Sequence, residues 1–574
     1  MTSDSSPLPS SPLVDLIRAS VIGDDHAMPA PYGERRVTYA DYTASGRALS
    51  FIEAFIREQV LPTYANTHTE SSGTGLQTTR LREQARRIIR DALGGDDRNS
   101  IIFCGSGSTA AIDKLVGILG LRIPAALDDR YHLSDRIPAE ERPVVFIGPF
   151  EHHSNELPWR ESIADVVTIR EDADGHIDQR HLAHELERHR KRPLRIGSFS
   201  AASNVTGIVS DTYAIARLLH EHGALSFWDF AAAGPYVDIQ MNPPDEPLAY
   251  KDAVFLSPHK FIGGPGTPGL LAVRRDICIN RVPTMPGGGT VTYVNAREHR
   301  YIDDIEQREE GGTPAIIESI RAGMVFQLKE AVGPDIIRER EEMFIRRAIA
   351  AWGSRPYLEV LGNKHSERLS IISFIVKHGG RYVHHNFVVA LLNDLFGIQA
   401  RGGCSCAGPY GHRLLGIDLE RSHQFEREIS RGCEGIKPGW VRVNFNYFID
   451  ERVFSYIVDA VDLVAEHGWK LLPDYRFDPV DALWRHRDGT PEPPLSLDAI
   501  RYVDGQMVAP HHDSRASIEE LPRYLEEARA LLASRTGERD APPGVFRAIS
   551  PEFDELRWFW LPESCVDRAA IASP

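Results

Sequence analysis

The chain has 574 residues, 42% hydrophobic and 25% charged, which excludes a collagenous, fibrous or wholly disordered protein. Its net charge of −16 argues against general attraction to nucleic acid or anionic lipid, and no apolar run approaches the ~18 residues of a membrane-spanning helix. The amino terminus lacks the features of a signal peptide and six cysteines are too few for a disulfide scaffold, so we expect a soluble cytoplasmic enzyme that binds neither nucleic acid nor membrane.

The first part of the chain changes its pattern twice. Residues 1–25 are rich in serine and proline and are expected to be flexible, apart from an apolar stretch at 13–22 that can dock as a helix. Residues 50–93 have mainly helical spacing. From about 100 to 275, apolar runs alternate with helical segments, which predicts a mainly parallel, buried sheet. The predicted strands are 101–103, 144–147, 196–199, 225–228, 254–256 and 270–273, with a helix at 213–222.

The remainder predicts a smaller domain and an extension. Helices are predicted near 340–352, 383–396 and 451–467, and strands near 369–376 and 439–447. The tail is expected to be irregular and to end in the aromatic patch Trp558-Phe559-Trp560. We therefore expect an α/β protein in four parts: a flexible segment 1–25, a large domain with a mainly parallel sheet at 26–330, a smaller α+β domain at 331–475, and an extension of unknown role at 476–574.

A polar cluster closely follows each of five predicted strands. The clusters are GSGST at 105–109, EHHSN at 151–155, SAASN at 200–204, DFAAA at 229–233 and SPHK at 257–260. Because ligands bind beyond the carboxyl ends of the strands in sheets of this type, the clusters predict one assembled site.

Lys260 and Asp229 each stand at the end of a predicted buried strand. Partial desolvation lowers the pKa of a lysine and makes its neutral amine available for a Schiff base. A carboxylate at a buried strand end needs a cationic partner, such as the protonated ring nitrogen of pyridoxal phosphate. Ser257 and His259 flank the lysine with the donors that an anchored phosphate would need. A surface lysine and a helix-capping acid remain the alternatives.

Two glycine-rich stretches need different interpretations. Residues 105–109 lie between a predicted strand and a helix, where backbone N–H groups and the helix terminus can bind a phosphate, although a plain helix cap is the alternative. Residues 264–269 have GxGxxG spacing, but a predicted strand follows them, and Pro265 and Pro268 lack N–H groups. We interpret them as a turn from Lys260 into the next strand and not as a nucleotide site.

The histidine pair and the cysteine loop offer further candidates. His152 and His153 are neighbours on an extended segment and point opposite ways, so we expect no metal site and favour one histidine stacking on a planar ring. Cys404 and Cys406 lie in a glycine-flanked loop, where they are either inert thiols or, with Arg401 nearby, a source of thiolate.

Arg442 lies in a stretch that alternates polar and apolar residues, so it shares one strand face with Asn444 and Asn446. Its guanidinium can bind a substrate carboxylate or pair with an internal acid. The sequence leaves both open.

Taken in chain order, these motifs resemble fold-type I pyridoxal-phosphate enzymes of the class V aminotransferase family, nearest the cysteine desulfurases and selenocysteine lyases. The resemblance runs from about Tyr39 to Asp450. It implies a large domain with a seven-stranded sheet, pyridoxal 5'-phosphate as cofactor, an amino acid as small-molecule substrate, and a homodimer with shared active sites.

The resemblance also implies roles for individual residues. Lys260 would carry the cofactor as an internal aldimine, Asp229 would pair with the ring nitrogen, Asn204 with the ring hydroxyl, and His152 would stack on the ring. Ser108, Thr109, Ser257 and His259 would hold the phosphate, and Thr313 would reach the phosphate of the partner subunit. Arg442 would bind the substrate carboxylate, Cys406 in the loop that begins at Arg401 would accept sulfur, and Asn66 and His68 would border the substrate entrance.

The implied reaction is conversion of L-cysteine to alanine with sulfur transfer to Cys406 and then to an acceptor protein. Relatives usually have glutamine where this chain has Ala232 and glutamate where it has Ala110, and the compact enzymes lack the last hundred residues. The alternatives are another class V reaction (an aminotransferase, a C–S lyase or an epimerase, perhaps in secondary metabolism) or a non-catalytic sulfur-relay or scaffold protein.

Overall fold

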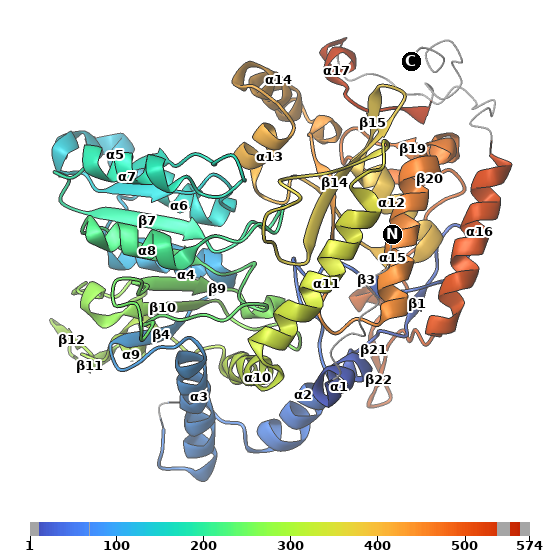
Figure 1. Cartoon of the computed structure of the whole chain (residues 1–574). Helices are drawn as coiled ribbons and strands as arrows, with labels where there is room; N and C mark the ends of the chain where they lie inside the picture. Colours follow the sequence, from blue (N-terminus) through green and yellow to red (C-terminus); the bar gives the residue numbers. More distant parts are fainter. Residues whose placement is uncertain (1–10, 68, 536–550, 563–574) are drawn as a thin grey trace. The chain divides into compact units, whose positions relative to one another are not determined.

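The computed structural model describes residues 11–67, 69–535 and 551–562 (Figure 1). The chain forms two compact units. The first contains the described residues up to Ile22, then Tyr42–Met343 and His365–Ser370; the second contains Gly23–Asp41, Phe344–Lys364 and the described residues from Ile371 onward. The domain boundaries expected from the sequence stay predictions, and the described residues after 476 lie within the second unit.

The first unit is built on a seven-stranded sheet in the order β4-β10-β9-β8-β7-β5-β6. The strands are β4 (Asn99–Phe103), β5 (Val144–Ile147), β6 (Asp165–Thr168), β7 (Arg195–Ser200), β8 (Leu225–Asp229), β9 (Ala253–Leu256) and β10 (Leu270–Arg274). The five strands from β6 to β9 run parallel, and β10 is antiparallel to both of its neighbours. The mainly parallel sheet predicted from the sequence is confirmed, with β6 as the one strand that the apolar runs missed.

Helices cover this sheet because its strands are apolar on both faces. Helix α4 packs against β9 and β10, and α8 packs against β8. The helices of this unit are α1 (Pro12–Ser20), α2 (Ser50–Phe55), α3 (Gly73–Ala92), α4 (Gly107–Ile118), α5 (Ala125–Tyr131), α6 (Leu157–Arg160), α7 (Gln179–Arg188), α8 (Thr212–Glu221), α9 (Ile305–Glu309) and α10 (Ile316–Val332), and a hairpin joins β11 (Val291–Val294) to β12 (His299–Tyr301). The apolar stretch near the amino terminus is helix α1, whose Val14 and Ile17 are buried.

The second unit has a five-stranded antiparallel sheet, in which β13, β14, β18 and β17 lie side by side and β15 also pairs with β14. Its strands are β13 (Leu358–Val360), β14 (Ile371–His378), β15 (Arg381–Val383), β17 (Arg401–Gly403) and β18 (Trp440–Asn444). Helix α11 (Pro334–Trp352) leads from the first unit into the second, which also contains α12 (His385–Phe396), α13 (Gly408–Leu414), α14 (Leu419–Ser430), α15 (Glu451–His467), α16 (Leu521–Ser534) and α17 (Pro551–Leu556).

Four two-stranded pairs complete this unit. They are β1 (Ala27–Met28) with β2 (Arg35–Arg36), β3 (Thr38–Tyr39) with β16 (Ile398–Gln399), β19 (Tyr475–Phe477) with β20 (Trp484–His486), and β21 (Arg501–Val503) with β22 (Gln506–Val508). The pairing of β3 with β16 is parallel and joins an early segment of the chain to the chain that follows α12.

The expectation of an irregular tail is wrong for much of the extension. Helix α16 buries Leu521, Tyr524, Leu525, Ala528 and Leu532 and packs against α12 and α15. These positions recur at three, four and seven residues, so the helical period is present in the sequence, and Pro522 stands in the first turn, where a helix tolerates proline. The DAPPGVF motif lies outside the described residues.

The aromatic patch at 558–560 docks on an edge of the second sheet. Phe559 forms a parallel bridge with Tyr382 of β15, whose carbonyl accepts the N–H of Trp560 at 3.1 Å. The indole of Trp560 donates to the carbonyl of His378 at 2.7 Å. The end of the extension therefore pairs with a sheet edge that would otherwise be open.

In the first unit, Gly269 lies where β10 begins and touches the loop that precedes α4. Its N–H donates to the carbonyl of Gly105 at 2.7 Å, and its carbonyl accepts the N–H of Cys104 at 2.8 Å. A Cβ at this position would lie 1.9 Å from the carbonyl oxygen of Gly107. The GxGxxG stretch is thus a turn into β10, as predicted, and its last glycine permits this contact between two backbones.

We predict that Gly269→Ala lowers the free energy of unfolding by about 3 kcal/mol, because backbone atoms on both sides must move to admit a methyl group. Gly73→Ala is the matched control, since no heavy atom lies within 4 Å of the added Cβ at the start of α3. It should leave stability unchanged or slightly raised. Chemical denaturation measures both, and equal midpoints for the two variants would contradict the close approach.

Candidate active site

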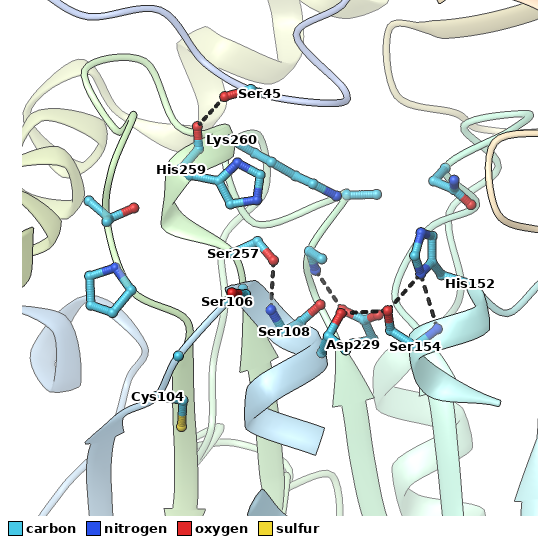
Figure 2. Close-up of a pocket in the computed structure, with 18 of the residues that line it drawn as sticks. Ser45, Cys104, Ser106, Ser108, His152, Ser154, Asp229, Ser257, His259 and Lys260 are labelled. Carbon is cyan, nitrogen blue, oxygen red and sulfur yellow. Dashed lines mark hydrogen bonds between the residues drawn. The ribbon is translucent and has the colours of Figure 1, made fainter. Parts of the chain in front are cut away.

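The carboxyl ends of β4, β5, β7, β8 and β9, with the turn before β10, surround a cavity of about 740 Å³ (Figure 2). All five predicted polar clusters contribute to its wall. The lining includes Ser106, Ser108, Thr109, His152, Ser154, Asn204, Asp229, Ala232, Ser257, His259 and Lys260. The structure therefore gathers at one place the residues that the sequence placed after separate strands.

Lys260 ends a short 3-10 turn that follows β9, and its N–H donates to the carbonyl of Ser257 at 3.0 Å. Two residues from an earlier segment of the chain fix this turn. The carbonyl of His259 accepts the N–H of Gly46 at 2.8 Å and the hydroxyl of Ser45 at 3.3 Å. Burial lowers the pKa of His259 to about 4, and the charge of Lys260 acts in the same direction. His259 is thus neutral near pH 7 and can donate one hydrogen bond without adding charge.

The loop before α4 forms the end of the cavity nearest the helix terminus. The N–H of Ser108 donates to the hydroxyl of Ser257 at 2.8 Å, and the hydroxyl of Thr109 lies 2.6 Å from that of Ser154. Gly107 has a φ of +56°, which turns the loop into the first turn of the helix. The N-terminus of α4 adds a partial positive charge here, so the arrangement suits an anion.

Asp229 is the last residue of β8 and is 5% exposed. Its Oδ1 accepts the N–H of Ala231 at 2.8 Å, and no group in the described part of the chain donates to Oδ2. Burial raises the pKa of the Asp229 carboxyl, while the Ala231 hydrogen bond and the charge of Lys260 lower it. A cation or N–H donor in the cavity would satisfy this carboxylate.

His152 presents its ring to the same cavity. Its Nδ1 accepts the N–H of Ser154 at 3.1 Å, which places the proton of a neutral ring on Nε2. His153 does not line the cavity, and the two rings are tilted by 49°. Only one histidine of the pair therefore faces the site.

Glu151 lies next to the cavity without lining it, and no role is predicted for it from the sequence. It is 4% exposed and accepts hydrogen bonds from Gly148, Asn155 and both the N–H and hydroxyl of Ser200, at 2.6 to 3.1 Å. Burial raises its pKa from 4.5 to about 7, and the charge of Asp229 contributes to the rise. Since Ser200 pairs with Asp229 across β7 and β8, Glu151 lies behind the wall that carries Asp229. The signal in the sequence was an acid four residues after a buried strand, at the start of a polar cluster.

Two arginine side chains and one aspartate side chain form a cluster in the second unit. Arg401 and Arg442 are register partners on β17 and β18. Arg442 donates from Nη2 to Oδ1 of Asp41 at 3.0 Å, and Arg401 donates from Nε to Oδ2 at 2.9 Å. Arg442 thus pairs with an internal acid, and its role in binding a substrate carboxylate stays a prediction.

The cysteine loop connects β17 to α13 in the same unit. Cys406 is exposed and Cys404 is half-buried. Ser405 and Cys406 have φ values of +51° and +55°, a conformation that costs free energy for residues with a Cβ. The loop therefore holds the thiol of Cys406 outward in a strained turn.

Two predicted residues of the first unit do not line the cavity. Thr313 and Asn66 are exposed and do not line it, and His68 lies outside the described residues.

The chain matches the family model of Aminotransferase class-V over residues 38–418. The chain belongs to this family. The resemblance seen in its motifs is confirmed, and the chain is an enzyme of the class. No helix in the described ranges has both the length and the apolar character needed to cross a membrane.

Curated relatives carry one recurring name. The chain is 24% identical over 397 residues to a probable cysteine desulfurase of Halobacterium salinarum, covering 68% of this chain and 88% of that one. It is 26% identical over 349 residues to a probable cysteine desulfurase of Halalkalibacterium halodurans, covering 60% and 78%.

Solved structures share the fold. A cysteine desulfurase of Thermococcus onnurineus NA1 superimposes with a TM-score of 0.60 at 20% identity, covering 75% of this chain and 95% of that one. The cysteine desulfurase CsdA of Escherichia coli gives a TM-score of 0.58 at 20% identity, covering 75% and 95%. The fold-type I architecture expected for the class V family is confirmed.

We predict that Glu151→Gln flattens the pH dependence of stability. Between pH 4.5 and about 7 folded Glu151 keeps a proton that the unfolded chain has released, so the parent loses up to about 3 kcal/mol as pH rises through this window. The variant lacks this titration. Denaturation curves at pH 5 and pH 8 measure the difference; the exposed Glu161→Gln is the control, and an unchanged slope in Glu151→Gln would refute the assignment.

A second prediction concerns the arginine cluster. Asp41→Asn removes the carboxylate that two guanidinium groups share, one of them on a residue only 4% exposed, and should cost about 3 kcal/mol of stability. Glu359→Gln, which breaks the exposed pair of Glu359 with Lys377, should cost less than about 1 kcal/mol. Thermal unfolding compares the two, and equal shifts would show that the cluster is not a stabilising unit.

Proposed function

We propose that the protein is a pyridoxal-phosphate-dependent enzyme that removes sulfur from L-cysteine, leaving alanine and passing the sulfur to Cys406. The observation that carries the proposal is the single cavity that contains Lys260, Asp229 and the loop 105–109. The named activity of the relatives supports the choice of reaction.

The residues present fit this cofactor. The N-terminus of α4, with Ser108, Thr109, Ser257 and neutral His259, would hold the phosphate. Oδ2 of Asp229 accepts no hydrogen bond from the described residues and would pair with a protonated ring nitrogen. Asn204 would contact the ring hydroxyl, His152 the ring face, and Lys260 the aldehyde carbon. When bound, the cofactor supplies an electron sink for a carbanion at the α-carbon of the amino acid.

The chain's own residues then bind the substrate and move protons. Arg442, which already pairs with Asp41, would bind the substrate carboxylate. The amine of Lys260 would remove the proton from the α-carbon of the substrate. Arg401 and Asn66 are proposed as further substrate contacts, as is His68.

Cys406 acts on the sulfur. Its thiolate attacks the sulfur of the substrate, forming an S–S bond as the C–S bond breaks, and the electron pair of the broken bond stays with the carbon. That carbon takes up a proton and becomes the methyl group of alanine. The sulfur remains on Cys406 as a persulfide, for which the exposed loop offers access to an acceptor protein.

We further propose a homodimer in which Thr313 serves the partner subunit. Its side chain is exposed and does not line the cavity of its own chain, as a residue with that role would require. Two measurements test this arrangement. The molecular mass in solution should be that of a dimer, and cofactor binding should be lost in a Thr313→Ala variant.

One observation favours a reaction of this family other than desulfuration. Ala232 lines the cavity where relatives usually have glutamine, so the ring hydroxyl would be contacted differently. The co-product separates the candidates: alanine indicates desulfuration, pyruvate indicates elimination, and a need for a 2-oxo acid indicates transamination.

We predict that Cys406→Ala lowers alanine formation from L-cysteine by roughly two orders of magnitude, because the sulfur has no acceptor. Cofactor absorbance should be unchanged. Cys404→Ala is the matched control and should keep most activity, whereas Lys260→Ala should lose both activity and the parental cofactor spectrum. Alanine production by Cys406→Ala at the parental rate would disprove the persulfide step.

A further inference from the structure

The end of the cavity that suits an anion is formed by one short segment, residues 104–109, which we call the anion loop. It leaves β4 and enters the first turn of α4, and Cys104, Ser106 and Ser108 all line the cavity (Figure 2). Strand β4 is at the edge of the sheet, so only β10 pairs with it. The conformation of the anion loop therefore depends on the contacts that fix the end of β4 and the body of α4.

Glu310 fixes the end of β4. It directly follows α9, and its Oε1 accepts the N–H of Phe103, the last residue of β4, at 2.7 Å. Arg82 and Arg86 of α3 both donate to the same carboxylate, and all three of these side chains are no more than 8% exposed. Burial raises the pKa of Glu310, but Arg86 and Arg82 outweigh this effect and lower the pKa overall. A charge-assisted hydrogen bond therefore holds Phe103 near neutral pH.

The preceding residue, Glu309, fixes α4. Nζ of Lys114, in the middle of α4, donates to the main-chain carbonyl of Glu309 at 2.7 Å and to the hydroxyl of Thr284 at 2.9 Å. Oε2 of Glu309 accepts the N–H and the hydroxyl of Thr284 and lies 3.6 Å from Nζ of Lys114. Two adjacent acids, which we call the acid pair, thus hold the strand before the anion loop and the helix after it.

The chain that follows the acid pair returns to the cavity. The N–H of Gly312 donates to the carbonyl of Gly288 at 2.9 Å, and Ala315 lines the cavity. Thr313, the residue proposed to serve the partner subunit, lies between Gly312 and Ala315. The acid pair is therefore connected to the anion loop by hydrogen bonds, and to a second segment of the cavity wall by the chain itself.

Glu306 makes a similar contact with β4, one helical turn before Glu310. Its Oε1 accepts the N–H of Ile101 at 2.9 Å. Ile101 is two residues before Phe103, and it does not line the cavity. Glu306 therefore holds the body of the strand, whereas Glu310 holds the end from which the anion loop leaves.

We propose that Glu309 and Glu310 are positioning residues that hold the anion loop in the conformation that binds the phosphate group of the cofactor. This inference rests on the proposed function, because the phosphate belongs to the cofactor assigned there. The acid pair does not line the cavity, so it acts through Phe103 on one side of the loop and Lys114 on the other. Backbone N–H groups bind an anion only when they converge on it, so moving either side weakens phosphate binding and leaves the contacts to the ring unchanged.

The test compares pyridoxal 5'-phosphate with pyridoxal, which lacks the phosphate. The Kd of each is measured for the full-length protein after removal of the cofactor from the holoenzyme. Glu310→Gln keeps an acceptor for Phe103 but removes the charge, and it should raise the Kd of pyridoxal 5'-phosphate about 10-fold. The Kd of pyridoxal should stay within about 2-fold of the parental value, since the ring contacts are unaffected. The phosphorus NMR resonance of the holoenzyme should shift in this variant.

Glu306→Gln is the matched control, because it weakens a similar contact of the same helix with the same strand. It should leave both Kd values and the phosphorus resonance as in the parent. Lys114→Met removes the attachment of α4 and should raise the Kd of pyridoxal 5'-phosphate by a factor similar to that of Glu310→Gln. Circular dichroism establishes which variants are folded, and Lys114→Met decides the test if Glu310→Gln is not.

Three results would overturn the inference alone. They are an unchanged Kd of pyridoxal 5'-phosphate in a folded variant of the acid-pair contacts, an equal rise in Kd for both ligands, and a rise in Glu306→Gln as large as that in Glu310→Gln. A parent protein that binds no pyridoxal 5'-phosphate would instead overturn the proposed function, and this inference with it.

Discussion

A carboxylate buried at the end of a central strand is the constraint around which the first unit is organised. Asp229 lies almost out of contact with solvent and accepts one backbone hydrogen bond, so its charge requires a cation beside it. Neighbouring groups add little charge beside Asp229. His259 is neutral near pH 7, and burial raises the pKa of Glu151, behind the wall, to about 7. A cavity built this way suits a cationic ring on the side of Asp229 and an anion at the N-terminus of α4.

The sequence predicted most of this unit because its strands are short and apolar on both faces. Runs such as 144–147 and 254–256 mark the buried strands, and a polar residue after each run marks the site. Strand β6 was missed because it is at the sheet edge and is only partly buried, which leaves a weaker pattern. The predicted cluster residues meet at one cavity since parallel strands end at a common edge.

Contacts between distant parts of the chain were beyond the reach of the sequence. The pairing of Arg442 with Asp41 joins residues about four hundred positions apart, and no local pattern distinguishes it from pairing with a substrate. The raised pKa of Glu151 depends on burial that becomes visible only when β5 and β7 are side by side. Helix α16 is a different case, because its apolar residues already recur at the helical period in the sequence.

The short stretch from Asp41 to Ser45 brings two of these features into one piece of main chain. The acid at its start is shared by two arginines of the second unit, and the hydroxyl at its end touches the turn that carries Lys260 in the first. The same stretch is where the chain passes from one unit to the other. Five residues of main chain thus carry an acid that serves a guanidinium pair at one end and a hydroxyl that serves the turn of a reactive amine at the other.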